Sequence, residues 1–494
     1  MATEVKESDS SLPPTAQQPS DPEDTLTDDP SGEKANAPPR KEKEIPSSSK
    51  PEEDWAESTD ELTTEDEQLF SGIDPGDETS RIQVLQADPT TPYYSANTFE
   101  ELGLSEELMK GIYHMKFSKP SKIQATSLPM IISSDGEYKN LIAQAHNGSG
   151  KSASFVLGML SRINYDTQNT QALCLVPTRE LARQIRDVIM ALGKFTQVTA
   201  ALAIKATEEE RKQNWASPST GVMSEHIVVG TPGKVMEFIK KRKFDTSSVK
   251  ILVVDEADEM VDMQGMGDQT IRIRRNLPKN VQVLLFSATY KDAVRKLATR
   301  LAPNANQITI KRETLSLDKV QQYYIDTGNK EERYTVLSEI YELLTLGQSI
   351  IFVRTRHEAH ALTQRLRNSG HTVSVLYGGD MSPEERDRVI DEFRAGITRV
   401  LITTNVLSRG VDVLAVNAVI NYDLPTDKFG RNADPETYLH RIGRTGRFGR
   451  KGIAINFVYD DRTKNILKDL EDYYSRQVIK VTDVEELSER IEKL

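Results

Sequence analysis

Short apolar, β-prone runs alternate with longer polar segments of helical character from about residue 97 onward. The first half of this region has four such runs, at residues 172–176, 226–230, 251–254 and 283–286. Alternation of this kind is typical of a parallel sheet whose strands are joined by crossover helices. We therefore predict an α/β domain over residues 91–310.

The same alternation restarts after Pro303, following a pause at residues 309–315. Its apolar runs lie at residues 321–325, 349–353, 372–376, 400–403 and 418–421. The pattern predicts a second α/β domain over residues 319–494, a linker at residues 311–318 and an exposed loop at residues 427–434. Two domains with a cleft between them suit a ligand that must close and open them.

The first 90 residues differ in composition from the rest of the chain. They hold 7 Lys and Arg against 24 Asp and Glu, a net charge of −17, so the remaining residues carry 63 − 7 = 56 basic and 75 − 24 = 51 acidic side chains, +5. This leader is rich in Pro, Ser, Thr and Glu, and we predict that it is mostly disordered because it has little apolar surface to bury. Residues 60–70 are compatible with a short acidic helix or with a solvated charge run.

The composition also bears on location and redox chemistry. No run of about 18 apolar residues is present, and the polar N-terminus lacks the apolar core of a signal peptide. We therefore expect a protein of the cytosol or nucleus. The single cysteine, Cys174, lies in an apolar run, so it cannot form an internal disulfide and is expected to pack as a small hydrophobe.

The stretch AHNGSGKS, which begins at Ala145, comes close to the phosphate-binding pattern G-x-x-x-x-G-K-[ST]. In such a loop, backbone N–H groups point at phosphates from a helix N-terminus, and a lysine reaches the β and γ oxygens. Gly148, Gly150, Lys151 and the Mg²⁺-facing hydroxyl of Ser152 supply these functions. Ala145 replaces the first glycine and is small enough for the turn to close. Taken alone, the segment is also compatible with a glycine-rich loop that opens a helix.

An apolar run ending in two acidic residues follows about a hundred residues later. At that position Asp255 can hold Mg²⁺ through its water shell, and Glu256 can orient and deprotonate an attacking water. The structural alternative is a helix N-cap with acidic residues in its first turn, which suits Asp258 better than Asp255.

The segment HRIGRTGR, which begins at His440, places three arginines among glycines and a threonine. Guanidinium groups from a second domain can neutralise charge that develops on a γ-phosphate, and hydrolysis would then depend on domain closure. Arg444 and Arg447 are the candidates for this role. Alone, the segment is also compatible with a basic patch that binds nucleic acid.

In order along the chain, these segments resemble the motifs of the DEAD-box ATP-dependent RNA helicases across residues 97–480. The matching segments are residues 117–124, 145–152, 177–181, 231–233, 255–258, 287–289, 351–355, 403–412 and 440–447. The resemblance implies two tandem RecA-like parallel-sheet domains joined by a short linker and preceded by the leader. Alanine is common in this family at the first P-loop position.

The resemblance further implies roles in binding and hydrolysing ATP. Phe117 would stack on adenine while Gln124 reads its edge, Asp412 would contact the ribose, and Ser287 and Thr289 would couple the γ-phosphate site to the RNA path. The implied set for ATP and Mg²⁺ is Phe117, Gln124, Ala145, His146, Asn147, Gly148, Ser149, Gly150, Lys151, Ser152, Asp255, Glu256, Gly410, Asp412, Arg444 and Arg447.

Members of the family hold one RNA strand by its sugar–phosphate backbone. The resemblance implies this role for Thr178, Arg179, Thr231 and Gly233 in the first domain and for Arg354, Thr355, Arg386 and Thr404 in the second. Such contacts carry no base information, so binding should be independent of sequence and sensitive to salt. Two departures stand out: the family's Gly-Gly motif is absent, with residues 201–205 in its place, and Ser408 replaces a usual alanine.

Within the family, several segments are similar to the mRNA-export helicases of the cytoplasmic face of the nuclear pore. They are residues 108–113, 116–124, 421–426, 434–440 and 447–452. This similarity implies a monomer of cytoplasm and nucleus that acts on mRNA–protein particles. It also implies a nucleoporin that competes with RNA at the first domain, and an inositol-phosphate-assisted activator at the second. The leader resembles a regulatory extension that would lie between the domains when RNA is absent.

We therefore expect an RNA helicase that clamps single-stranded RNA and remodels RNA–protein complexes with RNA-stimulated ATP hydrolysis. Two alternatives stay open, a translation-initiation helicase of the same fold and a slow ATP-locked RNA clamp that serves as an assembly platform. RNA-stimulated phosphate release distinguishes a remodelling enzyme from a slow clamp.

Overall fold

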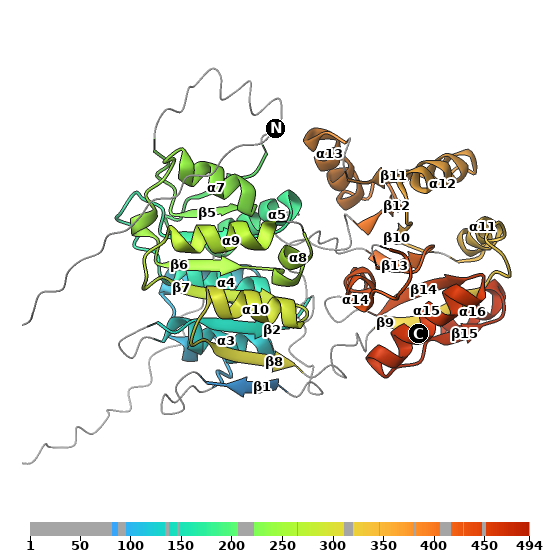
Figure 1. The fold of residues 1–494 in the computed structure, drawn as a ribbon. Helices are drawn as coiled ribbons and strands as arrows, with labels where there is room; N and C mark the ends of the chain where they lie inside the picture. The colour runs from blue at the N-terminus through green and yellow to red at the C-terminus, as the bar shows by residue number, and fades with distance from the viewer. Residues whose placement is uncertain are drawn as a thin grey trace, which may run out of the picture. The chain divides into compact units, whose positions relative to one another are not determined.

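The computed structural model arranges the chain into two sheets, each flanked by helices (Figure 1). The residues that it describes are 82–86, 95–133, 138–145, 148–205, 222–263, 265–310, 320–344, 346–378, 381–405, 416–427, 429–446 and 451–493. The predicted linker at 311–318 and all of the leader before residue 82 lie outside these residues.

The first sheet has eight strands in the order β1-β8-β2-β7-β6-β3-β5-β4, and every neighbouring pair except β1 and β8 is parallel. The strands, in the order of the chain, are β1 (Ile82–Leu85), β2 (Leu141–Gln144), β3 (Ala172–Leu175), β4 (Ala200–Ala203), β5 (Ile227–Gly230), β6 (Ile251–Val254), β7 (Gln282–Ser287) and β8 (Asn306–Ile310).

Helices cover both faces of this sheet. One face packs on α2 (Glu106–His114), α3 (Lys122–Ile132), α4 (Lys151–Leu160) and α5 (Arg179–Leu192). The other packs on α7 (Pro232–Lys240), α8 (Ala257–Asp262), α9 (Met266–Arg275) and α10 (Asp292–Leu301). The described residues of this half also include two 3-10 turns, η1 (Glu100–Leu102) and η2 (Thr246–Ser248). Alternate side chains of β3 enter opposite cores, Cys174 on one face and Leu173 on the other, because side chains alternate along a strand. Cys174 is fully buried, which confirms that it packs as a small hydrophobe.

The second sheet is parallel throughout, in the order β11-β12-β10-β13-β14-β9-β15. Its strands are β9 (Val320–Asp326), β10 (Gln348–Phe352), β11 (Val373–Leu376), β12 (Val400–Thr403), β13 (Val416–Asn421), β14 (Gly452–Val458) and β15 (Ile479–Val481). One face packs on α11 (Arg333–Leu343), α12 (Arg356–Asn368) and α16 (Val484–Glu492), and the other on α13 (Pro383–Arg394), α14 (Pro435–Ile442) and α15 (Asp461–Tyr474).

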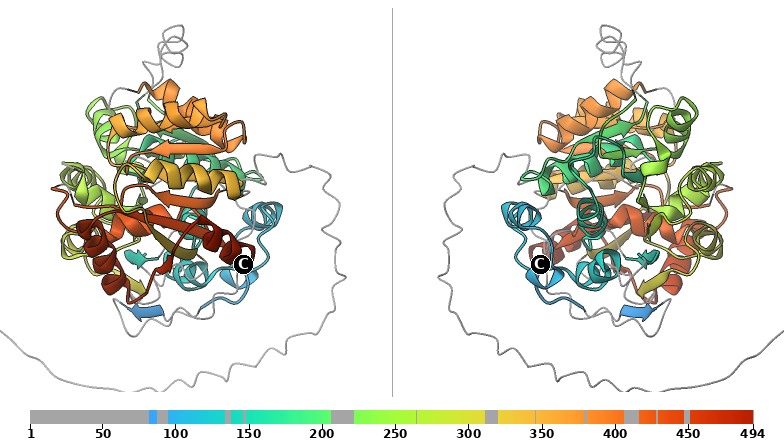
Figure 2. Two further views of the ribbon diagram at one scale, coloured as in Figure 1. Left: turned by 90° about the vertical axis from the view of Figure 1, so that its right-hand side faces the viewer. Right: turned by 90° about the vertical axis from the view of Figure 1, so that its left-hand side faces the viewer.

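These two sheets confirm the predicted α/β class, and they add strands that the sequence pattern did not single out. The additions are β1, β2, β4, β8, β14 and β15. β1 lies within the segment for which the sequence predicts mostly disorder, and it pairs antiparallel with β8 at the outer edge of the first sheet (Figures 1 and 2). The predicted loop at 427–434 is described apart from residue 428, and its Phe429 is 72% exposed.

Among the described helices, none combines the length and the apolar character that a membrane span requires. In both sheets the parallel strands bring their carboxyl ends to one edge, where loops that follow different strands can share a ligand. The segments singled out in the sequence follow β2, β3, β5, β6, β7, β10 and β12.

Candidate functional site

The glycine-rich loop connects β2 to α4, as a phosphate-binding loop requires. Gly148 and Gly150 both have positive φ, 78° and 94°, and Gly150 is the N-cap of α4. The buried Lys151 donates through Nζ to the carbonyl of Ala145 at 2.8 Å. Ala145 itself donates to the carbonyl of Ser287, so the small residue there joins β2 to β7 while the turn closes. The loop therefore aims the α4 N-terminus and a lysine at one point, which suits a polyphosphate.

The start of α3 is fastened to this loop. Ser121 donates from Oγ to the carbonyl of Ser149 at 2.7 Å, and Gln124 donates from Nε2 to the carbonyl of Gly150 at 3.3 Å. A Cβ on Gly150 would lie 2.6 Å from Nε2 of Gln124, so the positive φ and the close approach both require glycine. Phe117, predicted to stack on adenine, is 5% exposed and packs with the core of this face. The sequence indicated no role for Ser121.

Asp255 and Glu256 follow β6 in a buried position near the same sheet edge. Burial raises the pKa of Asp255 to about 7, since the favourable charge of Lys151 only partly offsets desolvation and the repulsion from Glu256. Glu256 has φ 49°, an uncommon value for a residue other than glycine, and it forms the N-cap of α8. Its Oε2 is buried and has no hydrogen-bond partner among the described residues. Two buried carboxylates beside a lysine are a favourable environment for a divalent cation.

Behind this pair, Asp258 receives two contacts on its Oδ2. Thr289 donates to it at 2.9 Å, and Nε2 of His440 lies 3.3 Å from it. Ser287, the other residue predicted to couple the two sites, is buried and its Oγ has no partner among the described residues. Asp258 was considered only as an acidic residue at a helix start, and it does lie in the first turn of α8. His440 was considered only as part of its motif, although the contact between the two joins residues of the two halves.

Two arginines of the segment that begins at His440 are described, and both are buried. Arg441 is 2% exposed and donates to Asn421 and to the carbonyl of Asp423, which makes it a core residue. Arg444 is also buried, and its Nε donates to the carbonyl of His440 at 3.1 Å. Five predicted site residues lie outside the described part of the chain, and their roles stay predictions: His146, Asn147, Gly410, Asp412 and Arg447.

The predicted RNA contacts of the first half follow β3 and β5. Thr178 is the N-cap of α5 and accepts a hydrogen bond from the Leu181 amide, while Thr231 is the N-cap of α7. Gly233 lies in the first turn of α7, where a Cβ would be 3.2 Å from Oε1 of Gln269. The buried Arg179 donates to Asp387 at 2.9 Å.

The contacts predicted for the second half lie at equivalent ends of its own strands. Arg354 and Thr355 follow β10, and both are exposed. Thr404 follows β12 and donates through its amide to the carbonyl of Leu376. Arg386 lies on α13 and pairs with Glu180 at 3.0 Å. Arg179 and Arg386 thus each face a carboxylate of the other half.

The two halves repeat one local structure, which we call the threonine corner. In the first, Thr178 lies three residues after β3 ends; in the second, Thr355 lies three residues after β10 ends. Both have φ −122° and ψ 154°, and both side chains accept from the amide three residues on. The sequence signal is a repeat, VPTR and VRTR. Each corner presents a hydroxyl and a helix N-terminus, a geometry that favours anions such as phosphate.

Comparison with known families agrees with this geometry. Residues 121–297 match the DEAD/DEAH box helicase model, and residues 332–449 match the helicase conserved C-terminal domain. The ATP-dependent RNA helicase DBP5 of Scheffersomyces stipitis is 50% identical over 390 residues, which is 79% of this chain and 75% of the relative. The dbp5 helicase of Schizosaccharomyces pombe is 46% identical over 445 residues, 89% of this chain and 86% of the relative.

Solved structures show the same similarity. One, described as S. cerevisiae Dbp5 bound to RNA and ADP BeF3, aligns with a TM-score of 0.75 and 46% identity, and covers 81% of this chain and 99% of its own. Another, a point variant of S. cerevisiae dbp5 bound to nup159, a gle1 variant, IP6 and ADP, aligns with a TM-score of 0.59 and 44% identity, and covers 79% of this chain and 99% of its own. The two sheets are therefore RecA-like domains, and the chain belongs to the DEAD-box family as an ATP-dependent RNA helicase of the DBP5 type.

Proposed function

We propose that this helicase clamps single-stranded RNA by its sugar–phosphate backbone and remodels RNA–protein complexes in mRNA export, driven by RNA-stimulated ATP hydrolysis. The repeated threonine corner is the observation that carries the proposal. Each RecA-like domain offers a hydroxyl and a helix N-terminus at the carboxyl edge of its sheet, beside an arginine. Two equivalent anion sites suit the evenly spaced phosphates of one strand.

Eight residues would form the RNA path, namely Thr178, Arg179, Thr231, Gly233, Arg354, Thr355, Arg386 and Thr404. Arg179 and Arg386 now pair with Asp387 and Glu180, and RNA phosphates would replace these carboxylates. Because the contacts are to the backbone, affinity should depend steeply on salt and little on base sequence.

The nucleotide site fits ATP with Mg²⁺. The loop from Ala145 to Ser152 would enclose the phosphates, and Lys151 would reach the β and γ oxygens. Ser152 would hold the metal through its hydroxyl, and Asp255 would hold it through the metal's water shell. The raised pKa of the buried Asp255 and the unpartnered Oε2 of Glu256 both support a cation at this place. Bound Mg²⁺ would neutralise charge on the phosphates.

Hydrolysis would depend on groups from both domains. Glu256 would orient the attacking water and accept its proton, while Arg444 and Arg447 would neutralise charge on the γ-phosphate after closure. Ser287, Thr289, Asp258 and His440 would connect this event to the RNA path, since Asp258 contacts both Thr289 and His440.

The comparisons suggest partners as well. Solved structures of a 44–45% identical relative contain gle1 and IP6, and one also contains nup159. We propose that this chain likewise binds a nucleoporin and an inositol-phosphate-assisted activator, and that it works at the cytoplasmic side of the nuclear pore. A fluorescently tagged chain should then concentrate at the nuclear rim, and a uniform signal would contradict this location.

The E256Q variant tests the enzymatic part of the proposal. Gln keeps the size of the side chain but cannot accept the water's proton, so RNA-stimulated phosphate release should fall by at least about a hundredfold. RNA retention with ATP should persist, measured by filter binding. E237Q, at a partly exposed carboxylate on α7, serves as the matched control and should behave as wild type. Full turnover in E256Q would refute the assigned role, and slow turnover in the wild type would favour an assembly clamp.

A further inference from the structure

A buried arginine on α11 lies behind the second threonine corner. Arg333 is 2% exposed, and its guanidinium makes four hydrogen bonds. Nε donates to the carbonyl of Lys330 at 3.1 Å, NH1 donates at 2.8 Å both to the carbonyl of Tyr422 and to Oδ1 of Asp423, and NH2 donates to Oε1 of Glu358 at 2.7 Å. The planar fork of arginine makes this set of bonds possible.

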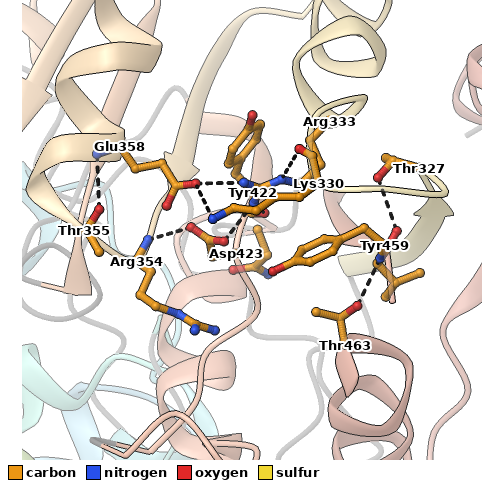
Figure 3. A network of polar contacts seen from close by, with 12 residues as sticks. Thr327, Lys330, Arg333, Arg354, Thr355, Glu358, Tyr422, Asp423, Tyr459 and Thr463 are labelled. Carbon is orange, nitrogen blue, oxygen red and sulfur yellow. Dashed lines mark hydrogen bonds and ion pairs between the residues drawn. The ribbon is translucent and has the colours of Figure 1, made fainter. Parts of the chain in front are cut away.

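Both acidic residues that accept hydrogen bonds from Arg333 also contact the threonine corner (Figure 3). The other oxygen of Asp423, Oδ2, accepts from the backbone amide of Arg354 at 2.8 Å. The amide of Glu358 donates to Oγ1 of Thr355 at 3.1 Å, the capping bond of α12. One guanidinium thus fixes, through two carboxylates, the backbone of Arg354 and the helix end that Thr355 caps.

Two aromatic rings complete the surroundings of Arg333. Its guanidinium carbon lies 4.1 Å from the ring centroid of Tyr422 and 4.9 Å from that of Tyr459. In Figure 3 the side chain of Arg354 points away from this network, while its backbone amide faces Asp423. The Arg333–Asp423 pair is buried between these rings, at 2% and 4% exposure, so this half of the network lies in a low-dielectric environment.

The charges explain why the network requires an arginine. Burial raises the pKa of Glu358, and the neighbouring Asp423 raises it further, while Arg333 opposes both effects. For Asp423, burial is outweighed by hydrogen bonds and by the charge of Arg333, and its pKa lies below the ordinary value. Without Arg333, the buried Asp423 would lose its ion pair, and the partly exposed Glu358 would be left with the exposed Lys330, whose Nζ lies 3.8 Å from Oε1. A buried carboxylate that loses its cation relaxes by protonation or by movement of the chain.

We propose that Arg333 is a positioning residue for RNA: through Asp423 and Glu358 it holds Arg354 and Thr355 in the pose that grips the backbone. The inference rests on the proposed role of this corner in RNA binding. Arg333 itself does not touch RNA. Its loss would therefore weaken the grip of the second domain on RNA, with no direct effect on ATP binding at the loop between β2 and α4.

The test compares R333M and R333K in the full-length chain. R333M should raise the RNA concentration for half-maximal ATPase stimulation by about ten- to a hundredfold, because a small misplacement of a binding group is costly. R333K keeps the charge but not the fork and should recover part of the loss. Affinity for a fluorescent ATP analogue, measured without RNA, should be unchanged. The control is R490M, which removes an exposed arginine paired with Glu486 on α16.

Combination with the corner gives the decisive measurement. Fluorescence anisotropy with labelled oligo(U) and a non-hydrolysable ATP analogue compares wild type, R333M, the double variant R354A/T355A and the triple variant. If Arg333 acts through the corner, the triple variant binds RNA no more weakly than the double. Additive losses would overturn the positioning role. If R354A/T355A binds RNA as wild type does, the proposed RNA path itself is wrong.

Folding is monitored in parallel by thermal unfolding. If R333M does not fold, E358Q and R333K decide instead, because both keep the volume and remove only one part of the network. The proposal is supported if E358Q or R333K weakens RNA affinity in the otherwise wild-type chain but causes no further loss when combined with R354A/T355A. Wild-type RNA affinity in both would overturn it.

Discussion

At the residue scale, the nucleotide site concentrates unfavourable states in a small volume. Glu256 combines a positive φ with a buried Oε2 that has no hydrogen-bond partner among the described residues, and Asp255 next to it is buried beside a like charge. Strain and buried charge of this kind persist only where the surrounding fold enforces them. We expect them to reduce the stability of the free enzyme, in line with the cation proposed for this site.

The pH dependence of protein stability should reveal the energetic cost of burying Asp255. Asp255 has a folded-state pKa of about 7, raised by burial from 3.8, so the native state binds an additional proton between these values. Its stability therefore falls as pH rises towards 7 and then levels off. In EDTA without nucleotide, D255N should gain in melting temperature over wild type from pH 5 to 7, with no further gain to pH 8.5. A difference in melting temperature between D255N and wild type that does not change with pH would contradict the raised pKa of Asp255.

At the scale of elements, the two threonine corners cap α5 and α12, and in our proposal they also form the RNA-facing edge of each domain. Removing a capping hydroxyl costs roughly 1 kcal/mol of stability, so T178A and T355A should each lower the unfolding free energy of their own domain by about that amount. T178S and T355S keep the hydroxyl and should stay near wild type. Denaturant unfolding measures the first effect.

The same variants should separate stability from RNA binding. Because each corner would contact one part of the strand, T178A and T355A should each weaken RNA affinity, and the double variant should weaken it further. Serine variants serve as controls in the same anisotropy assay. If T178A and T355A lose stability but keep wild-type RNA affinity, the two threonines only cap their helices and do not bind RNA.

Sequence pattern predicted those elements whose signal is local. The strands before both threonine corners are buried and mostly apolar, and their pattern indicated them correctly. The sequence pattern did not predict β4, because Ala200–Ala203 is rich in alanine and only partly buried, which is a weak strand signal. It did not predict β14 either, because the first residue, Gly452, and the polar Asn456 interrupt the apolar run, although all seven residues of the strand are buried.

The sequence predicted those residues of the candidate site that lie within a recognisable motif. The spacing of Gly150, Lys151 and Ser152 is enough by itself to indicate a phosphate loop. Arg333 was not predictable in this way, because its partners Asp423 and Glu358 are distant in sequence and only the fold brings them together. The same is true of the ion pair between Arg179 and Asp387.

At the scale of the whole molecule, charge is unevenly divided along the chain. The leader carries −17 and the remaining residues +5. An acidic segment tethered to an RNA-binding surface competes with RNA for the same cations. We expect the leader to lower ATP turnover in the absence of RNA.

Deleting residues 1–80 tests this expectation and spares β1, which begins at Ile82. The shortened chain should show faster RNA-independent phosphate release, and the difference should shrink as salt screens the attraction. A chain of the same length, with the leader's Asp and Glu replaced by Asn and Gln, is the matched control and should resemble the deletion. An unchanged rate would exclude autoinhibition by this segment.

The antiparallel strand at the margin of the first sheet has a further consequence. Val84 and Leu85 pair with Ile308 and Gln307 of β8, so the backbone of β8 is bonded on both sides. A chain shortened past residue 86 would leave that backbone bare, and bare strand backbones recruit other chains. We therefore expect β1 to protect the margin of the first sheet from self-association.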